Sequence, residues 1–250
     1  MVTSKTMLAS VLSIAFLVSG AWAGQVAPPS NLANILHSIG EQERSVFAAD
    51  GASLLGGVLD VRHTTAVKAA RLYAENEVAA DRQLYRQNVL LSGTVFSINS
   101  GLGNVPYIVL AAPTALQVQA RLADEATNEA ATLKKGQKVI LFCRGAGAVA
   151  GSPVFRNCLF AEYAANVKWA DLTREVSDFY QGQKPTSMDV VWIAGSASTI
   201  AELISPNACT TAGPDCRSAV FDAMRHKDFK SQLAATVDAF KKAGLTIPSR

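Results

Sequence analysis

The sequence is poor in the residues that most often build metal and cofactor sites. It has three histidines and four cysteines among 250 residues. The histidines are His37, His63 and His226, which lie far apart in the sequence, and no Cys-x-x-Cys pair is present. Structural zinc sites usually combine such ligands at short spacing. We therefore expect no metal site and no cofactor.

Common catalytic motifs are missing as well. There is no Gly-x-Ser-x-Gly nucleophile elbow and no Gly-x-x-x-x-Gly-Lys-Ser/Thr phosphate loop. The run from Gly145 to Gly151 resembles a Gly-x-Gly-x-x-x-Gly pattern, but it lies between two strand-like segments and not before a helix, which favours a hairpin loop. Glu77 and Asp81 are four residues apart and suit an exposed helix face. We therefore expect a protein that is not an enzyme and has no catalytic residues.

Charge is also sparse, at 17% of the residues, with a net charge of +3. This argues against a strongly basic nucleic-acid or membrane-surface protein. The charge is unevenly distributed, because residues 66–160 contain ten Lys/Arg and six Asp/Glu, whereas residues 161–250 contain ten of each. The central segment is therefore mildly basic.

The N-terminal 23 residues resemble a secretory signal peptide. Lys5 precedes an apolar stretch over residues 7–18, and Ala21-Trp22-Ala23 is a small-x-small cleavage site. Cleavage after Ala23 leaves no cysteine at the new N-terminus, so a lipid anchor is not indicated. No later segment is long and apolar enough to span a bilayer. We expect a periplasmic or secreted protein with no membrane span in the mature chain.

The four cysteines form an even set, which in an exported protein indicates disulfides. Three pairings are possible. The spacing favours Cys143–Cys158 and Cys209–Cys216, because each pair brackets a turn-rich segment.

The middle of the chain has the alternating pattern of β-strands. Five strands are expected, with a glycine bend at Gly93 in the first and a short helix over residues 124–133 between the third and fourth. This order matches the OB-fold, a partly open five-stranded barrel, and a generic five-stranded sandwich is the alternative. The expected strands cover residues 86–96, 106–112, 115–122, 137–144 and 154–160.

Helical spacing dominates on both sides of the strands. A helix over residues 65–80, capped by Thr65, precedes them, and a short helix over 31–39 precedes a loop at 50–57. Later helices are expected over residues 169–180, 188–204, 217–226 and 229–243. The fold class is therefore α+β, with an N-terminal leader and helix (24–64), an OB-fold barrel (65–160) and a helical C-terminal region (161–250).

Several of these segments together resemble the tRNA_anti-like family of OB-fold proteins. The run Tyr73-Ala-Glu-Asn-Glu-Val-Ala-Ala-Asp81, then Tyr85, then Val89-Leu-Leu-Ser-Gly-Thr-Val95, carries the resemblance with Leu133-Lys-Lys-Gly-Gln-Lys-Val139 and the Cys143/Cys158 pair. The resemblance covers about residues 66–160. The family name implies nucleic-acid binding by analogy of fold, and fold alone does not fix function.

The C-terminal region is similar to small helical periplasmic immunity proteins of type VI secretion. The likeness rests on Trp192-Ile-Ala-Gly195, Cys209 and the amphipathic helices that follow. An ordinary helical extension packed on the barrel is the alternative.

An OB-fold usually binds its ligand on its second and third strands and the adjoining loops. The residues expected there are Tyr107, Gln117, Gln119, Arg121, Phe142, Arg144 and Arg156. Such a set suits a protein, peptide or glycan partner as well as a nucleic acid, and a solvated strand face is the alternative. We expect Asn76 and Asp81 to cap the end of the helix before the barrel and to tie it to the first strand through side-chain hydrogen bonds. Contact with a partner is the alternative.

These observations favour an exported, non-catalytic OB-fold binding protein of unknown ligand. Oligonucleotide binding through the barrel face is the second hypothesis. An immunity or envelope-stress protein is the third.

Overall fold

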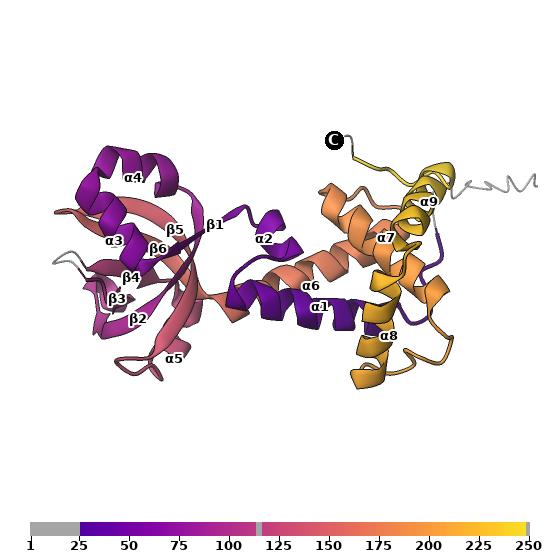
Figure 1. Cartoon of the computed structure of the whole chain (residues 1–250), viewed down its shortest axis with the longest axis horizontal. Helices are drawn as coiled ribbons and strands as arrows, with labels where there is room; N and C mark the ends of the chain where they lie inside the picture. Colours follow the sequence, from indigo (N-terminus) through magenta and orange to yellow (C-terminus); the bar gives the residue numbers. More distant parts are fainter. Residues whose placement is uncertain (1–25, 114–116, 249–250) are drawn as a thin grey trace, which may run out of the picture.

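The computed structural model describes residues 26–113 and 117–248, which form a β-barrel lobe and a helical lobe joined end to end (Figure 1). The expected signal peptide, including Lys5 and Ala23, lies outside the described residues. So does the start of the expected third strand, at residues 114–116. In chain order, the elements are α1 (Leu32–Ala49), α2 (Leu54–Val58), β1 (Val61–Thr65), α3 (Ala66–Glu75), α4 (Glu77–Leu84), β2 (Asn88–Ser100), η1 (Leu102–Asn104), β3 (Pro106–Leu110), β4 (Val118–Leu122), η2 (Asp124–Ala126), α5 (Thr127–Ala130), β5 (Lys138–Val149), β6 (Ser152–Phe160), α6 (Ala161–Tyr180), α7 (Met188–Leu203), α8 (Pro214–Arg225) and α9 (Phe229–Lys242).

Five strands close into a barrel in the order β2-β3-β4-β6-β5, with β5 returning to pair with β2. The β4–β6 pair is parallel and the other barrel pairs are antiparallel. The short helical turns η2 and α5 lie between the third and fourth barrel strands. This is the arrangement of an OB-fold, so the predicted α+β fold class is confirmed.

The long strand β2 has Gly93 near its middle, where the sequence predicts a bend, and its pairing with β3 shifts register between Val95 and Ser97. A Cβ at this position would lie 3.0 Å from Leu110 Cδ1 and 3.1 Å from the Ala66 Cβ. Glycine therefore allows the start of α3 and the neighbouring strand to approach β2 closely.

Strand β1 is an addition to the barrel that the sequence does not predict. It pairs with β2 in parallel, from Val61 opposite Asn88 to Thr65 opposite Ser92. Arg62 and His63 are exposed on it, so the segment lacks the apolar alternation that marks most strands. Just before it, α2 occupies part of the expected loop, and the Ser53 side chain caps that helix.

The expected single helix over residues 65–80 is two helices, α3 and α4, that meet at Asn76. The Thr65 hydroxyl accepts from the Lys68 N–H at 3.0 Å and caps α3, as predicted. Asn76 is extended, with φ −165°, and its Oδ1 accepts from the Ala79 N–H at 3.0 Å, which starts α4. Helix α3 buries alanines and Tyr73 in the barrel core, and Figure 1 shows α4 and α5 on opposite sides of the barrel.

The glycine-rich run between β5 and β6 is a hairpin, as predicted, but most of it is strand. Strand β5 continues to Val149, beyond its expected end at residue 144. Only Ala150 and Gly151 form the turn, with φ of 49° and 79°. Two consecutive positive φ values match the type I′ turns that join twisted antiparallel strands.

Helices α1 and α6 to α9 share one apolar core, separate from the core of the barrel. Helix α1 is twice as long as the sequence indicates and packs along α6, where a Cβ at Gly40 would lie 2.1 Å from Trp169 Nε1. Helix α9 ends at Lys242, and Gly244 terminates it two residues later, with φ 86° and a hydrogen bond of 3.0 Å from the Leu245 N–H to the Phe240 carbonyl. None of the helices within the described residues is long and apolar enough to cross a membrane.

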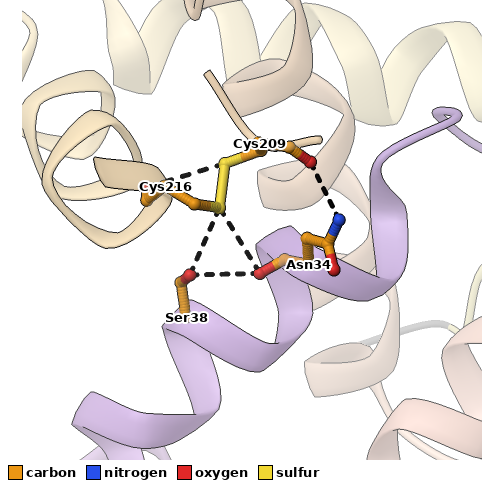
Figure 2. Close-up of a disulfide and its surroundings, with 4 residues drawn as sticks. All are labelled: Asn34, Ser38, Cys209 and Cys216. Carbon is orange, nitrogen blue, oxygen red and sulfur yellow. Dashed lines mark hydrogen bonds between the residues drawn. A yellow bond between two sulfur atoms is a disulfide. The ribbon is translucent and has the colours of Figure 1, made fainter. Parts of the chain in front are cut away.

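Both predicted disulfides are present. Cys143–Cys158 joins β5 to β6 inside the barrel, and Cys209–Cys216 closes the segment between α7 and α8. Figure 2 shows the second bond against α1, where Asn34 Nδ2 donates to the Cys209 carbonyl at 2.9 Å and the Ser38 hydroxyl lies 3.4 Å from Cys216 Sγ. This disulfide thus fixes the α7–α8 segment to the N-terminal helix.

Candidate nucleic-acid interface

Three arginines and a tyrosine form a row across four neighbouring strands on the outer face of the barrel. Tyr107 on β3 is the direct cross-strand partner of Arg121 on β4, and Arg144 on β5 is the direct partner of Arg156 on β6. With strands about 4.8 Å apart, the row extends over about 14 Å. We call Tyr107, Arg121, Arg156 and Arg144 the arginine row.

A β-bulge on β6 connects the two halves of the row. Between Phe155 and Cys158, β6 has one residue more than its partner β4, where only Arg121 lies between the paired Ala120 and Leu122. Asn157 takes φ 51° at this bulge, and both Arg156 and Asn157 are exposed. The bulge therefore lets β6 present Arg156 beside Arg121 while Cys158 still turns inward to its disulfide.

The charges of the row are not neutralised by any carboxylate in the described part of the chain. The guanidinium groups of Arg121, Arg144 and Arg156 are exposed, and none makes an ion pair with a carboxylate in residues 26–113 or 117–248. Arginine offers five N–H donors in a planar fork that suits phosphate oxygens. The row can therefore bind an extended anionic ligand.

The two predicted glutamines lie along β4 beside the row. The burial pattern of β4 alternates, so Gln119 faces outward like Arg121, and Gln117 is exposed just before the strand. Gln119 is flanked by Val109 on β3 and Val154 on β6. These amides can donate and accept hydrogen bonds next to the cationic row.

Tyr107 is half-buried beside the loop that joins β2 to β3. A Cβ at Gly101 in that loop would lie 3.5 Å from Tyr107 Cδ1, so the ring lies against the loop backbone. Loops at this position are part of the usual ligand face of an OB-fold.

Phe142 is the predicted site residue that the structure places apart from the others. Its ring packs against Phe47 of α1, with the ring centroids 6.3 Å apart, and joins the core of the helical lobe. It therefore helps attach the barrel to the helices.

Asn76 and Asp81 make the local hydrogen bonds that the sequence indicates. Asn76 caps α4, and Asp81 Oδ1 accepts from the Tyr73 hydroxyl at 2.8 Å. Burial and this hydrogen bond raise the pKa of Tyr73 well above its usual range, so the phenol remains a donor. This hydrogen bond joins α4 to α3. From the sequence, we expect a bond from this helix to the first barrel strand instead.

A cavity of about 820 Å³ lies away from the row, between α1, α6 and α8, and contains the Glu41–Arg217 ion pair. Within the parts of the chain that the structure describes, no three His, Cys, Asp or Glu side chains gather as a metal site.

Comparison with known proteins identifies one family and several similar solved structures, among them the two described below. The tRNA_anti-like family model matches residues 1–159. A search of curated protein sequences found no significant match. A protein from Klebsiella pneumoniae, proposed to be a nucleic acid-binding lipoprotein, aligns over 42% of this chain and 95% of its own, with 12% identity and a TM-score of 0.36. A protein from Leishmania major, proposed to be an aspartyl-tRNA synthetase, aligns over 40% of this chain and 20% of its own, with 10% identity and a TM-score of 0.29.

Proposed function

Since this chain belongs to the tRNA_anti-like family, we propose that it is a non-catalytic protein that binds single-stranded nucleic acid with the outer face of its barrel. The observation that carries this proposal is the arginine row. Single-strand binding proteins combine a cationic track for the phosphates with aromatic rings for the bases. Arg121, Arg156 and Arg144 supply the track, and Tyr107 stands at one end of it.

The row also favours a nucleic acid over the other partners that the sequence leaves open. A neutral glycan or peptide could bind to Gln117 and Gln119, but it would gain little from three adjacent unpaired cations. A polyanion releases bound counterions when its phosphates meet such cations, and this gain in entropy drives association.

We further propose that the protein acts outside the cytoplasm. The hydrophobic N-terminal segment of the sequence and the two disulfides support export, because disulfides persist in oxidising compartments. The sequence lacks the motifs of nucleophilic and phosphate-transfer enzymes, which supports a binding role over a catalytic one.

The proposal is tested by fluorescence anisotropy with labelled single-stranded DNA and RNA of about 15 nucleotides, a length within the range that one OB-fold covers. The protein is purified from an exporting host with both disulfides formed, and binding is measured at about 50 and 200 mM NaCl. We expect binding that weakens with salt. The triple variant R121Q/R144Q/R156Q should lower the slope of log K against log[salt] by about 2, because each lost phosphate contact on a single strand removes about 0.7.

A matched control removes the same charge elsewhere. The variant R71Q/R174Q/R225Q changes three exposed arginines on α3, α6 and α8, and it should retain most of the affinity and slope. Absence of binding, binding that is insensitive to salt, or equal losses in the two triple variants would overturn the proposal. Turnover of an oligonucleotide by the purified protein would overturn the non-catalytic assignment.

A further inference from the structure

An exposed tyrosine and an arginine make a cation–π contact at the junction between α4 and β2. The Arg86 guanidinium carbon lies 5.1 Å from the centroid of the Tyr85 ring, within the range of a cation–π contact. The Tyr85 residue is 41% exposed, and its hydroxyl makes no hydrogen bond to any other residue that the structure describes. Packing in the protein core therefore does not explain why a tyrosine occupies this position.

Backbone hydrogen bonds hold this pair beside the arginine row. The Arg86 N–H donates to the Gly145 carbonyl at 2.9 Å, and the Gly145 N–H donates to the Gln87 carbonyl at 3.0 Å. Gly145 directly follows Arg144, the last member of the row. Tyr85 is the bridge partner of Gly145, so the pair lies next to the end of the row opposite Tyr107, on the side of β5 that faces α4.

The glycine-rich run makes room for this arrangement. A Cβ at Gly145 would lie 1.8 Å from the Leu84 carbonyl oxygen, so only glycine lets the end of α4 approach β5 this closely. A Cβ at Gly147 would lie 3.8 Å from Tyr85 Cδ2, an ordinary van der Waals distance, so the ring lies near β5 at this glycine. Gly145 thus allows the end of α4 to place Tyr85 beside β5.

The helix before the pair is fixed by the residues that carry the family resemblance. Asn76 starts α4 through its cap, and the Tyr73–Asp81 hydrogen bond joins α4 to α3. Helix α4 then ends at Leu84, immediately before Tyr85. These contacts limit the positions that Tyr85 can take relative to the barrel.

We propose that Tyr85 and Arg86 form a stacking platform for a base of the single-stranded nucleic acid whose phosphates contact the arginine row. This inference rests on the function proposed above. Bases stack on aromatic rings and on guanidinium planes, and a ring already paired with an arginine offers both in one place. The platform gives the row a second aromatic side chain, at the opposite end from the half-buried Tyr107.

The test compares an oligonucleotide that has bases with one that lacks them. Anisotropy is measured with a labelled 15-mer of deoxythymidine, dT15, and with an abasic strand of the same length. The Y85A variant should bind dT15 about 5- to 150-fold more weakly than the wild type, the range that corresponds to loss of one stacked base. Its affinity for the abasic strand and its salt slope should be unchanged, because no charge is removed.

Tyr163 provides a matched control, since it is 40% exposed and lies on α6 in the helical lobe. Y163A should bind both strands as the wild type does. Y85W supplies a second readout, because its added indole fluorescence should be quenched by dT15 and not by the abasic strand.

The outcomes separate the two proposals. If the wild type binds neither strand, the proposed function fails and this inference fails with it. If the wild type binds dT15 in a salt-dependent way but Y85A binds it equally well, or the Y85W fluorescence does not respond, the function stands and the stacking platform is wrong. If Y85A does not fold, the Y85W quenching decides the inference by itself.

Discussion

Arg144 on β5 and Arg156 on β6 lie directly opposite each other on neighbouring antiparallel strands. Like charges at such positions are destabilising, and no carboxylate in the described part of the chain pairs with either group. A stability cost at an exposed position is typical of a functional surface.

The first prediction follows from this repulsion. R156Q should raise the free energy of unfolding at low salt, by up to about 1 kcal/mol, while it weakens oligonucleotide binding. The gain should shrink at high salt, where the charges are screened. Urea denaturation at two salt concentrations measures the first effect, and anisotropy measures the second. R71Q, which removes an exposed arginine on α3, should change neither quantity appreciably. A loss of stability in R156Q at low salt would contradict the repulsion argument.

The arginine row shows which features of the candidate site can be predicted from the sequence and which cannot. The alternation of β4 places Arg121 outward, and the hairpin places Arg144 and Arg156 near its base, so each residue is predictable individually. Their alignment depends on strand register and on the bulge at Asn157, and neither leaves a clear pattern in the sequence. Turn signals and hydrophobic alternation are local, whereas register results from the packing of the whole barrel.

Phe142 and β1 are two further features that could not be predicted from local sequence patterns. Alternation places Phe142 outward, but Phe47, which covers it, belongs to a helix far away in the sequence. Strand β1 is an exposed edge strand with Arg62 and His63 on it, so it has no apolar pattern to detect. By contrast, the barrel order and both disulfides could be predicted, because turn-rich segments and strand spacing are encoded locally.

The second prediction concerns the cap between α3 and α4. N76A removes the side-chain oxygen that accepts from the Ala79 N–H, so the midpoint of urea unfolding should fall, by an amount equivalent to about 1 kcal/mol. Because α4 precedes Tyr85, dT15 affinity should fall as well. N128A, which changes an exposed asparagine on α5, serves as the control and should leave both unchanged. An unaltered midpoint in N76A would mean that the cap contributes little.

The third prediction concerns the disulfides and the proposed compartment. Non-reducing peptide mapping of protein isolated from the periplasm should find Cys143 joined to Cys158 and Cys209 joined to Cys216. Replacing the first pair with serines should cost more stability than replacing the second, because it closes the longer loop, 15 residues against 7. In the chain-entropy model, each bond contributes about 2 to 3 kcal/mol, and the two bonds differ by about 0.7 kcal/mol. Free thiols at all four positions would contradict the proposed export.

The fourth prediction is a loss of stability at alkaline pH that depends on Tyr180. Burial in the helical lobe raises the pKa of Tyr180 from 10.0 to about 12, against a smaller lowering by the Ser198 hydrogen bond. The folded state therefore holds the phenol proton more tightly than the unfolded chain does. The resulting stability is fully present below pH 10 and is lost as the pH rises from 10 to about 12, because the unfolded state ionises first.

Absorbance at 295 nm should show a tyrosine that titrates late in the wild type and is missing in Y180F. The variant should be less stable at neutral pH, since Phe cannot donate to the Ala194 carbonyl, which lies 2.8 Å from the Tyr180 hydroxyl. Its unfolding free energy should nevertheless fall less steeply between pH 10 and 12. Y163F, which changes the exposed tyrosine on α6, controls for loss of a hydroxyl and should leave the alkaline slope as in the wild type. Equal slopes in Y180F and the wild type would show that Tyr180 does not set the alkaline limit of the helical lobe.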